Sequence, residues 1–209
     1  MTRIIGGSAG GRRLQTPPGV ATRPTADRVR EALFSALEAE FGSLHGLRVL
    51  DLYAGSGAVA LEAASRGAVG VAAVESDRRT ARVVAANAAS LGFEVDVRPQ
   101  PVATVLAVPP AAAYDVVYLD PPYPLASEEV ARVLGLLVAH GWVAPGGTVV
   151  VERSARSVEP GLPDGLVPLR RKKYGETVLW YLRRHPTGSE HIADTDQDPV
   201  GDGGPSAGT

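Results

Sequence analysis

The chain has 209 residues, with 21 Lys and Arg, 23 Asp and Glu, four His and no Cys. This length suits one α/β domain with some excess, and contents of 44% hydrophobic and 21% charged residues are ordinary for a globular protein. The lack of Cys excludes disulfides, zinc ribbons, iron–sulfur clusters and thiol catalysis, and the scattered His residues lack metal-ligand spacing, so we expect no metal site.

The ends of the chain predict neither export nor membrane insertion. Ile4 and Ile5 are the only apolar pair in residues 1–13, which is too little for a signal peptide. No apolar run approaches the ~18–20 residues of a membrane span. We therefore expect a cytoplasmic protein that does not contact a membrane.

Charge is distributed unevenly along the chain. Residues 185–209 hold five acidic residues and no Lys or Arg, which leaves residues 1–184 with 21 basic and 18 acidic side chains. The first thirty residues carry six Arg against Asp27, and a second basic cluster spans residues 170–173. Such clusters favour a phosphate-rich partner, although a set of solvated surface arginines explains them equally well.

The predicted elements alternate after an N-terminal segment. Residues 1–22 are Gly-rich and predict a β-hairpin or flexible arm, and a helix opens at residues 24–25. From residue 47 onward, strand and helix patterns follow one another. Strands are expected at 47–53, 69–75, 93–98, 114–120 and 148–152, helices at 58–66, 77–91, 102–107 and 127–140, and a closing antiparallel pair at 166–173 and 177–183.

This alternation predicts an α/β fold: a seven-stranded, mostly parallel sheet with helices on both faces. We divide the chain into an arm (1–22), one domain (23–184) and an acidic tail (185–209). The tail is rich in Gly, Pro, Asp and Ser, which predicts disorder. Ligands of such sheets bind beyond the carboxyl ends of the strands, so informative residues should directly follow strands.

The first motif, Asp51-Leu-Tyr-Ala-Gly-Ser-Gly57, joins a predicted strand to a helix. Gly55 and Gly57 allow close backbone approach to a ligand, and free N–H groups at the helix start can bind a carboxylate. Glu75, at the end of the next strand, can accept hydrogen bonds from a ribose diol. The spacing admits a dinucleotide or S-adenosylmethionine, but Asp51 suits an amino group and would repel a pyrophosphate. A tight turn without a ligand is the alternative.

The second motif, Asp120-Pro121-Pro122-Tyr123, ends the fourth predicted strand. Consecutive prolines extend neither sheet nor helix, so they predict a rigid elbow. The Asp120 carboxylate and the Pro121 carbonyl can accept the two N–H bonds of an exocyclic base amine and stabilise the charge that develops on nitrogen. Tyr123 can stack on the base. A purely structural turn is the alternative.

Together these motifs resemble class I S-adenosylmethionine-dependent amino-methyltransferases. Further segments resemble the bacterial RsmD family, and this resemblance extends over residues 3–183. Members of that family methylate the N2 amine of one guanine in 16S ribosomal RNA. These segments are Arg3-Ile-Ile-Gly-Gly7, Arg23-Pro-Thr25, Arg28-Val-Arg-Glu-Ala-Leu-Phe34, Ser65-Arg-Gly-Ala68 and Lys173-Tyr-Gly175. The resemblance implies a Rossmann-like class I methyltransferase fold with an N-terminal extension.

The resemblance also implies residue roles. Asp51, Tyr53, Gly55 and Gly57 would bind the methionine side of the cofactor, and Glu75 its ribose. Asp120, Pro121 and Tyr123 would hold and activate the guanine amine. RNA phosphates would contact Arg3, Arg12, Arg13, Arg23, Arg171, Lys172 and Lys173. A polar residue that often binds the adenine amine is replaced here by Pro101, so adenine would rest on backbone groups and apolar walls.

The implied reaction is direct transfer of the methyl group, because no Cys can attack a pyrimidine ring. Three alternatives stay open. The chain could be a DNA amino-methyltransferase, although no separate target-recognition region is evident. It could also be a binding module that has lost the chemistry, or, more remotely, a nicotinamide oxidoreductase.

Overall fold

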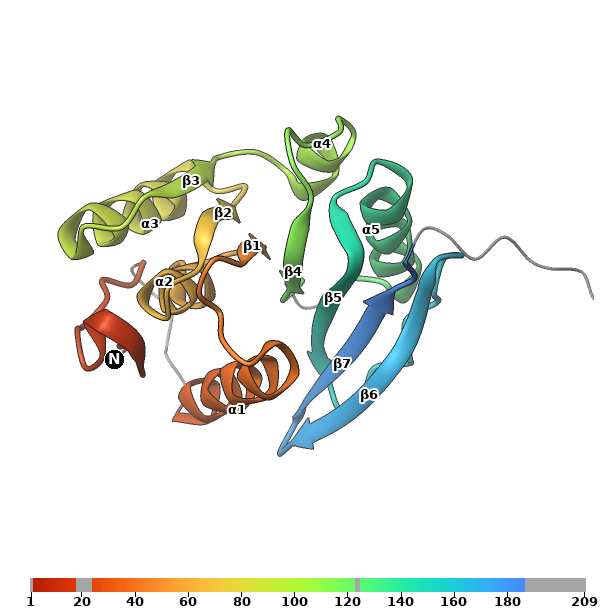
Figure 1. Ribbon diagram of the computed structural model, residues 1–209, viewed down its shortest axis with the longest axis horizontal. Coiled ribbons are helices and arrows are strands. Elements are labelled where there is room, and N and C mark those ends of the chain that lie inside the picture. The colour runs from red at the N-terminus through yellow and green to blue at the C-terminus, as the bar shows by residue number, and fades with distance from the viewer. Residues whose placement is uncertain (1, 18–23, 123–124, 187–209) are drawn as a thin grey trace, which may run out of the picture.

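The computed structural model describes residues 2–17, 24–122 and 125–186. Its seven strands form one sheet in the order β3-β2-β1-β4-β5-β7-β6 (Figure 1). Strands β1 to β5 pair in parallel, and β7 lies antiparallel between β5 and β6. Their bounds are β1 Arg48–Leu52, β2 Val69–Val74, β3 Val95–Arg98, β4 Tyr114–Leu119, β5 Val143–Ser154, β6 Leu166–Tyr174 and β7 Thr177–Arg184.

Helices cover both faces of the sheet. Apolar residues of α4 and α5 pack on one face, against alternate residues of β1, β4 and β5. Apolar residues of α1, α2 and α3 pack on the other face, against the intervening strand residues, whose side chains point to that face. The bounds are α1 Pro24–Phe41, α2 Ala58–Ser65, α3 Arg78–Leu91, α4 Val102–Leu106 and α5 Ser127–Ala139. The predicted fold class is therefore confirmed, with helices on both faces of a mostly parallel sheet.

Strand β5 differs most from its predicted bounds, because it begins at Val143 rather than Thr148. The added segment contains Gly146, with φ +74°, and Gly147, where a Cβ would lie 2.9 Å from the Ala144 carbonyl oxygen. Only glycine fits these positions comfortably, so the strand crosses an irregularity that sequence patterns treat as a turn.

The N-terminal arm forms a short hairpin with a 3₁₀ turn at Gly7–Ala9 and a single bridge between Arg3 and Arg13. Ile4 and Leu14 are buried in a cluster that includes residues of α2 and α3. The buried Glu62 of α2 accepts the backbone N–H groups of Ile5 at 2.7 Å and Gly6 at 2.8 Å. The arm is thus a packed part of the domain surface over residues 2–17.

Within the described ranges, no helix is long and apolar enough to cross a membrane, and no group of His, Asp and Glu is arranged to hold a metal ion. Residues 187–209 of the predicted tail lie outside these ranges, as do Arg23 and Tyr123.

Candidate active site

The candidate site lies where the parallel strands β1, β2, β4 and β5 end. Asp51 pairs with Ala73 of β2 on one side and with Tyr118 of β4 on the other. The chain leaves β1 toward β2 and reaches β4 only later, so β1 and β4 flank the switch point at which ligands bind in open α/β sheets. The first motif follows β1, and the second follows β4.

Asp51 is 2% exposed, and it holds the start of α2 in place. Its Oδ2 accepts the backbone N–H of Ala60 at 3.0 Å. Burial raises the pKa of Asp51 to about 7, the Ala60 N–H opposes this rise, and the nearby Glu75 adds to it. A cationic group placed against this carboxyl would favour its ionised form.

The loop after β1 is built on left-handed backbone. Tyr53 has φ +63°, and Gly55 and Gly57 have φ +53° and +77°. A Cβ on Gly57 would lie 2.6 Å from Val84 Cγ1 of α3, whereas a Cβ on Gly55 would meet nothing within 4 Å. Glycine at 57 is therefore required by helix packing, and the space beside Gly55 is open for a ligand.

Glu75 follows β2 and spans the gap to the loop. Its Oε2 accepts the Gly55 N–H at 2.9 Å, and its Oε1 accepts the Asp77 N–H at 2.8 Å. A carboxylate oxygen has two lone pairs, so these bonds orient Glu75 and still leave acceptor capacity for hydroxyl groups.

A small cavity of about 180 Å³ opens beside Glu75. Tyr53, Pro101, Val102 and Leu125 provide mostly apolar walls, and Glu75 and Glu129 provide carboxylates. This combination of apolar walls and few polar groups suits part of a nucleoside, and Pro101 forms part of the wall.

A larger open groove of about 680 Å³ lies elsewhere, among Arg48, Phe93, Arg98 and Tyr114. It contains none of the predicted site residues, and we assign it no role.

The proline elbow begins directly at the end of β4. The backbone N–H of Asp120 bonds to the Leu52 carbonyl of β1 at 3.4 Å, which joins the two motifs. Pro121 is buried, and the Pro122 carbonyl accepts the Leu125 N–H at 2.8 Å. Arg153 Nη2 donates to the Leu125 carbonyl at 2.8 Å and holds the far end of the elbow.

A second carboxylate, Glu152, lies beside Asp120. Leu119 pairs with Val151 in the parallel β4–β5 ladder, so Asp120 and Glu152 are the next residues on the two strands. The buried Tyr118 hydroxyl donates to Glu152 Oε2.

The pKa values of both neighbouring acids are raised. Desolvation, followed by the charges of Glu152 and Asp51, raises the pKa of Asp120, while Arg153 opposes the rise. The pKa of Glu152 is also raised, by desolvation, and the Tyr118 hydroxyl bond opposes that rise. The Asp120 carboxylate nevertheless keeps contact with solvent. Neighbouring acids with shifted pKa values are typical of functional sites.

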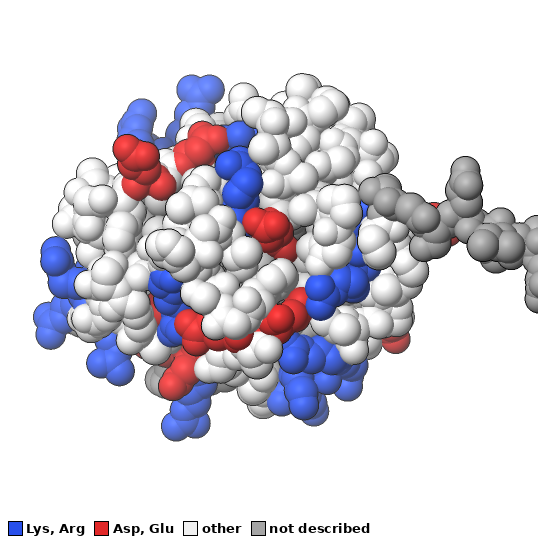
Figure 2. Space-filling model, viewed as in Figure 1, with Lys and Arg blue, Asp and Glu red and all other residues white. Residues whose placement is uncertain are grey.

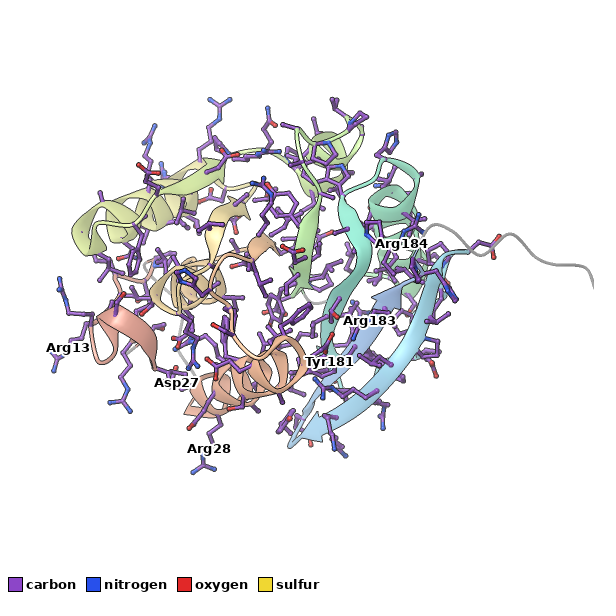
Figure 3. All side chains as sticks on the ribbon, viewed as in Figure 1. Arg13, Asp27, Arg28, Tyr181, Arg183 and Arg184 are labelled. Atoms are coloured by element: carbon purple, nitrogen blue, oxygen red, sulfur yellow. The ribbon has the colours of Figure 1, made fainter. Side chains whose placement is uncertain are left out.

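Figure 2 shows basic side chains spread over this face of the molecule, with acidic side chains between them. The described residues of the predicted RNA-contacting set lie on two segments, the arm and β6. Arg3, Arg12 and Arg13 are exposed on the arm, and Arg13 points outward in Figure 3. The hairpin surface, defined by Arg171, Lys172 and Lys173 of β6, is also exposed, with Arg171 4.9 Å from the Trp180 ring centroid.

Arg170, the first residue of the basic cluster, has a structural role instead. It packs over the Tyr181 ring at 4.2 Å and pairs with Glu40 of α1 at 3.6 Å.

Three residues that sequence reasoning did not single out support the site. Glu152 directly follows apolar strand residues, as Glu75 and Asp120 do, so the same rule would have found it. Tyr118 and Asn87 carry no such sequence signal. Asn87 of α3 donates to the carbonyls of Gln15 at 2.9 Å and Ser56 at 3.3 Å, linking the arm to the glycine loop.

Sequence comparison places the chain in a family. The family described as conserved hypothetical protein 95 matches residues 2–183. The chain is 35% identical over 196 residues to ribosomal RNA small subunit methyltransferase D of Escherichia coli K12, covering 92% of this chain and 94% of that protein. It is 32% identical to the putative rRNA methyltransferase YlbH of Bacillus subtilis, covering 87% and 99%.

Structure comparison agrees with this placement. The putative methyltransferase yhhF from Escherichia coli superposes with a TM-score of 0.76 at 30% identity, covering 88% of this chain and 98% of that one. Magnesium protoporphyrin IX methyltransferase from Synechocystis, solved with bound S-adenosylmethionine, superposes with a TM-score of 0.60 at 15% identity, over 79% and 86%. The latter likeness shows that the fold is shared with class I methyltransferases.

Proposed function

The chain belongs to the RsmD family, the conserved hypothetical protein 95 family, and from that premise we propose that it transfers a methyl group from S-adenosylmethionine to the N2 amine of a guanine in 16S ribosomal RNA. It is a small-subunit rRNA methyltransferase by full-length homology. The guanine amine, the site residues and the RNA contacts are the finer parts of this proposal.

The observation that carries the proposal is the junction of the two motifs. The Asp120 N–H bonds to Leu52 at the end of β1, and Asp51 pairs with Tyr118 at the end of β4. A ligand on the glycine loop and a base on the proline elbow would therefore meet across two adjacent strand ends. Close, oriented contact between the reacting atoms is the main requirement of a direct transfer.

The residues of the first motif fit S-adenosylmethionine. The space beside Gly55 would admit its methionine part, Asp51 would face the cationic amine, and Glu75 would bind the ribose hydroxyls. The apolar cavity wall at Pro101 and Val102 would lie against adenine. The cofactor supplies a methyl group already activated on a sulfonium.

The residues of the second motif supply orientation and charge. The Asp120 carboxylate and the Pro121 carbonyl would accept the two N–H bonds of N2, which directs the nitrogen lone pair toward the methyl carbon. The N–C bond forms as the C–S bond breaks, and Asp120 stabilises the positive charge that develops on N2. The amine proton then leaves to water, which reaches the solvent-exposed Asp120.

The RNA would bind to the exposed basic groups of the arm and of the hairpin surface. Arginine and lysine contacts to phosphates position a nucleic acid and carry little sequence information. Target choice therefore rests on RNA shape and on contacts within the base pocket.

Transfer of tritiated methyl groups tests the proposal, with undermethylated small subunits, free 16S RNA and duplex DNA as acceptors. We expect label in N2-methylguanosine from the subunit or its RNA. Label only in DNA would overturn the proposal in favour of a DNA amino-methyltransferase, and no transfer to any of the three acceptors would also contradict it.

A further inference from the structure

Glu152 is a carboxylate at the acceptor side of the site that the proposed transfer does not use. It lies in β5, two residues before the strand ends at Ser154, and Asp120 directly follows β4, so the parallel register makes the two residues neighbours. The β5 residues alternate between the two cores, which places Val150, Tyr118 and Glu152 on the same face of the sheet. The Tyr118–Glu152 hydrogen bond agrees with this placement.

The bond from Tyr118 fixes one oxygen and leaves the other available. Tyr118 is 5% exposed and its hydroxyl donates to Oε2. Oε1 accepts no hydrogen bond from any residue of the ranges 2–17, 24–122 and 125–186, and it is not among the buried atoms without a partner. A half-buried carboxylate thus presents one oriented, solvent-accessible acceptor beside the elbow.

Holding two carboxylates side by side is unfavourable for folding. Like charges on adjacent strand positions repel, and the charge of Glu152 raises the pKa of Asp120. A tyrosine hydroxyl needs only a neutral acceptor, which a glutamine would provide. The hydrogen bond with Tyr118 therefore does not by itself explain a charged group at position 152. A strong hydrogen-bond acceptor for a ligand explains it better.

The bases differ at the atom next to the reactive amine. Guanine carries N1–H, a donor, directly beside its N2 amine. Adenine has the N1 acceptor beside its N6 amine, and cytosine has the N3 acceptor beside its N4 amine. An acceptor placed next to the amine site would bond to guanine and repel the lone pair of either other base.

We propose that Glu152 Oε1 accepts the N1–H of the target guanine while Asp120 holds its N2 amine, and that Glu152 thereby selects guanine over other amino bases. Tyr118 is a positioning residue, since it orients Glu152 without reaching the base. This inference rests on the proposed function and names the group that would give it base specificity.

The test uses a substrate that keeps the amine and lacks the donor. The methylated guanine of the small subunit is first located, and that position is then replaced by 2-aminopurine through RNA ligation and subunit assembly. 2-Aminopurine retains the 2-amino group but has a lone pair at N1. Methyl transfer to guanine and to 2-aminopurine is compared by kcat/KM for the full-length wild type, Glu152→Gln and Tyr118→Phe.

We expect the wild type to prefer guanine over 2-aminopurine roughly 10- to 100-fold, the usual value of one charged contact to a base edge. Glu152→Gln should reduce this ratio at least ~5-fold, because its amide can donate to the N1 lone pair. Tyr118→Phe should reduce the ratio less. Glu94→Gln, which also removes one carboxylate, lies on an exposed site before β3 and should keep the wild-type ratio.

Two results would overturn the inference: a wild type that methylates both bases equally, or a Glu152→Gln variant that keeps the full preference for guanine. Thermal unfolding of each variant accompanies the kinetics, since the ratio of two substrates on one folded enzyme is insensitive to a general loss of stability. Failure of the proposed function itself is distinct, because the wild type would then fail to form N2-methylguanosine at all.

Discussion

The residues proposed to bind the methyl donor, called here the donor half, are Asp51, residues 53–57 and Glu75. In this half, carboxylate side chains accept hydrogen bonds from backbone N–H groups. Asp51 accepts the Ala60 N–H, and Glu75 accepts the Gly55 N–H. The residues proposed to bind the methyl acceptor, called here the acceptor half, are Tyr118, Asp120, Pro121 and Glu152. In this half, the Tyr118 side chain donates a hydrogen bond to the Glu152 side chain, and Asp120 remains exposed to solvent. The donor half is thus held together by its own hydrogen bonds, whereas the acceptor half presents carboxylates to solvent.

This difference implies that changes in the two halves have separable effects. Donor-half changes should alter backbone geometry, cofactor affinity and stability together. Acceptor-half changes should alter transfer and base choice with little effect on cofactor affinity. The predictions below can break or sharpen that separation.

The largest effect is expected for Asp120→Ala in the acceptor half. If Asp120 stabilises the charge on N2 as proposed, its loss should lower kcat roughly 100- to 1,000-fold, in the range of a single oriented electrostatic group. Single-turnover transfer with tritiated S-adenosylmethionine measures this loss. Glu128→Ala, an exposed carboxylate in the first turn of α5, is the control and should transfer normally. Wild-type turnover by Asp120→Ala would refute its assignment.

In the donor half, Gly57→Ala should destabilise the fold by about 2–4 kcal/mol. The cost combines left-handed backbone, worth about 1–2 kcal/mol, with the contact of the new Cβ on Val84 at 2.6 Å. Denaturant unfolding of Gly57→Ala, Gly55→Ala, Val84→Ala and Gly57→Ala/Val84→Ala measures the two parts.

Gly55→Ala should show only the backbone cost. Because Val84 is fully buried, Val84→Ala destabilises by itself, and the double variant should lose less than the sum of the Gly57→Ala and Val84→Ala losses. Equal destabilisation by Gly57→Ala and Gly55→Ala would mean that the contact with Val84 contributes nothing.

The pH dependence of stability reports on Asp51. Its pKa in the folded protein is about 7, above the ordinary value of 3.8, so between these values the folded state binds more protons than the unfolded state. The contribution of Asp51 is therefore complete below about pH 4 and is lost as the pH rises through 7.

Relative to Asp51→Asn, the wild type should lose up to about 4 kcal/mol of unfolding free energy across this window, at 1.36 kcal/mol per pKa unit. Urea unfolding of both proteins between pH 4 and 8 measures the difference. A difference that stays constant with pH would contradict the raised pKa.

The smallest effect is expected on the hairpin surface. Changing Arg171, Lys172 and Lys173 to Ala should weaken RNA binding about 10-fold and flatten its salt dependence, with cofactor affinity unchanged. The charge-matched control changes Arg78, Arg79 and Arg82, exposed on α3, to Ala. If both triple variants weaken RNA binding equally, the hairpin surface contributes only through the net charge of the protein and not through specific contacts. Filter binding at several salt concentrations measures both.

The donor half was the more predictable part from sequence, because it is local. A strand, a glycine loop and a helix lie within residues 48–65, and Glu75 follows one strand later. The elements were likewise predicted by short-range periodicity, except at β5, where Gly146 and Gly147 continue a strand in unusual backbone.

The residues that escaped prediction depend on pairing between distant segments. Glu152 acquires its neighbours only when β5 pairs with β4, and Tyr118 looked like one more strand residue. Glu62 resembles a solvated helix position, yet it is fully buried and holds the arm. Such roles follow from register and packing, which propensity and periodicity do not encode.

The separation of the two halves is tested most directly by calorimetric titration of S-adenosylmethionine into Glu75→Ala and Asp120→Ala, prepared alongside the wild type. We predict that Glu75→Ala weakens the affinity at least ~10-fold, since it loses both the proposed ribose contact and the Gly55 N–H bond, whereas Asp120→Ala stays within about threefold of the wild type. Equal weakening in both variants, or a larger loss in Asp120→Ala, would contradict the division into a donor half and an acceptor half.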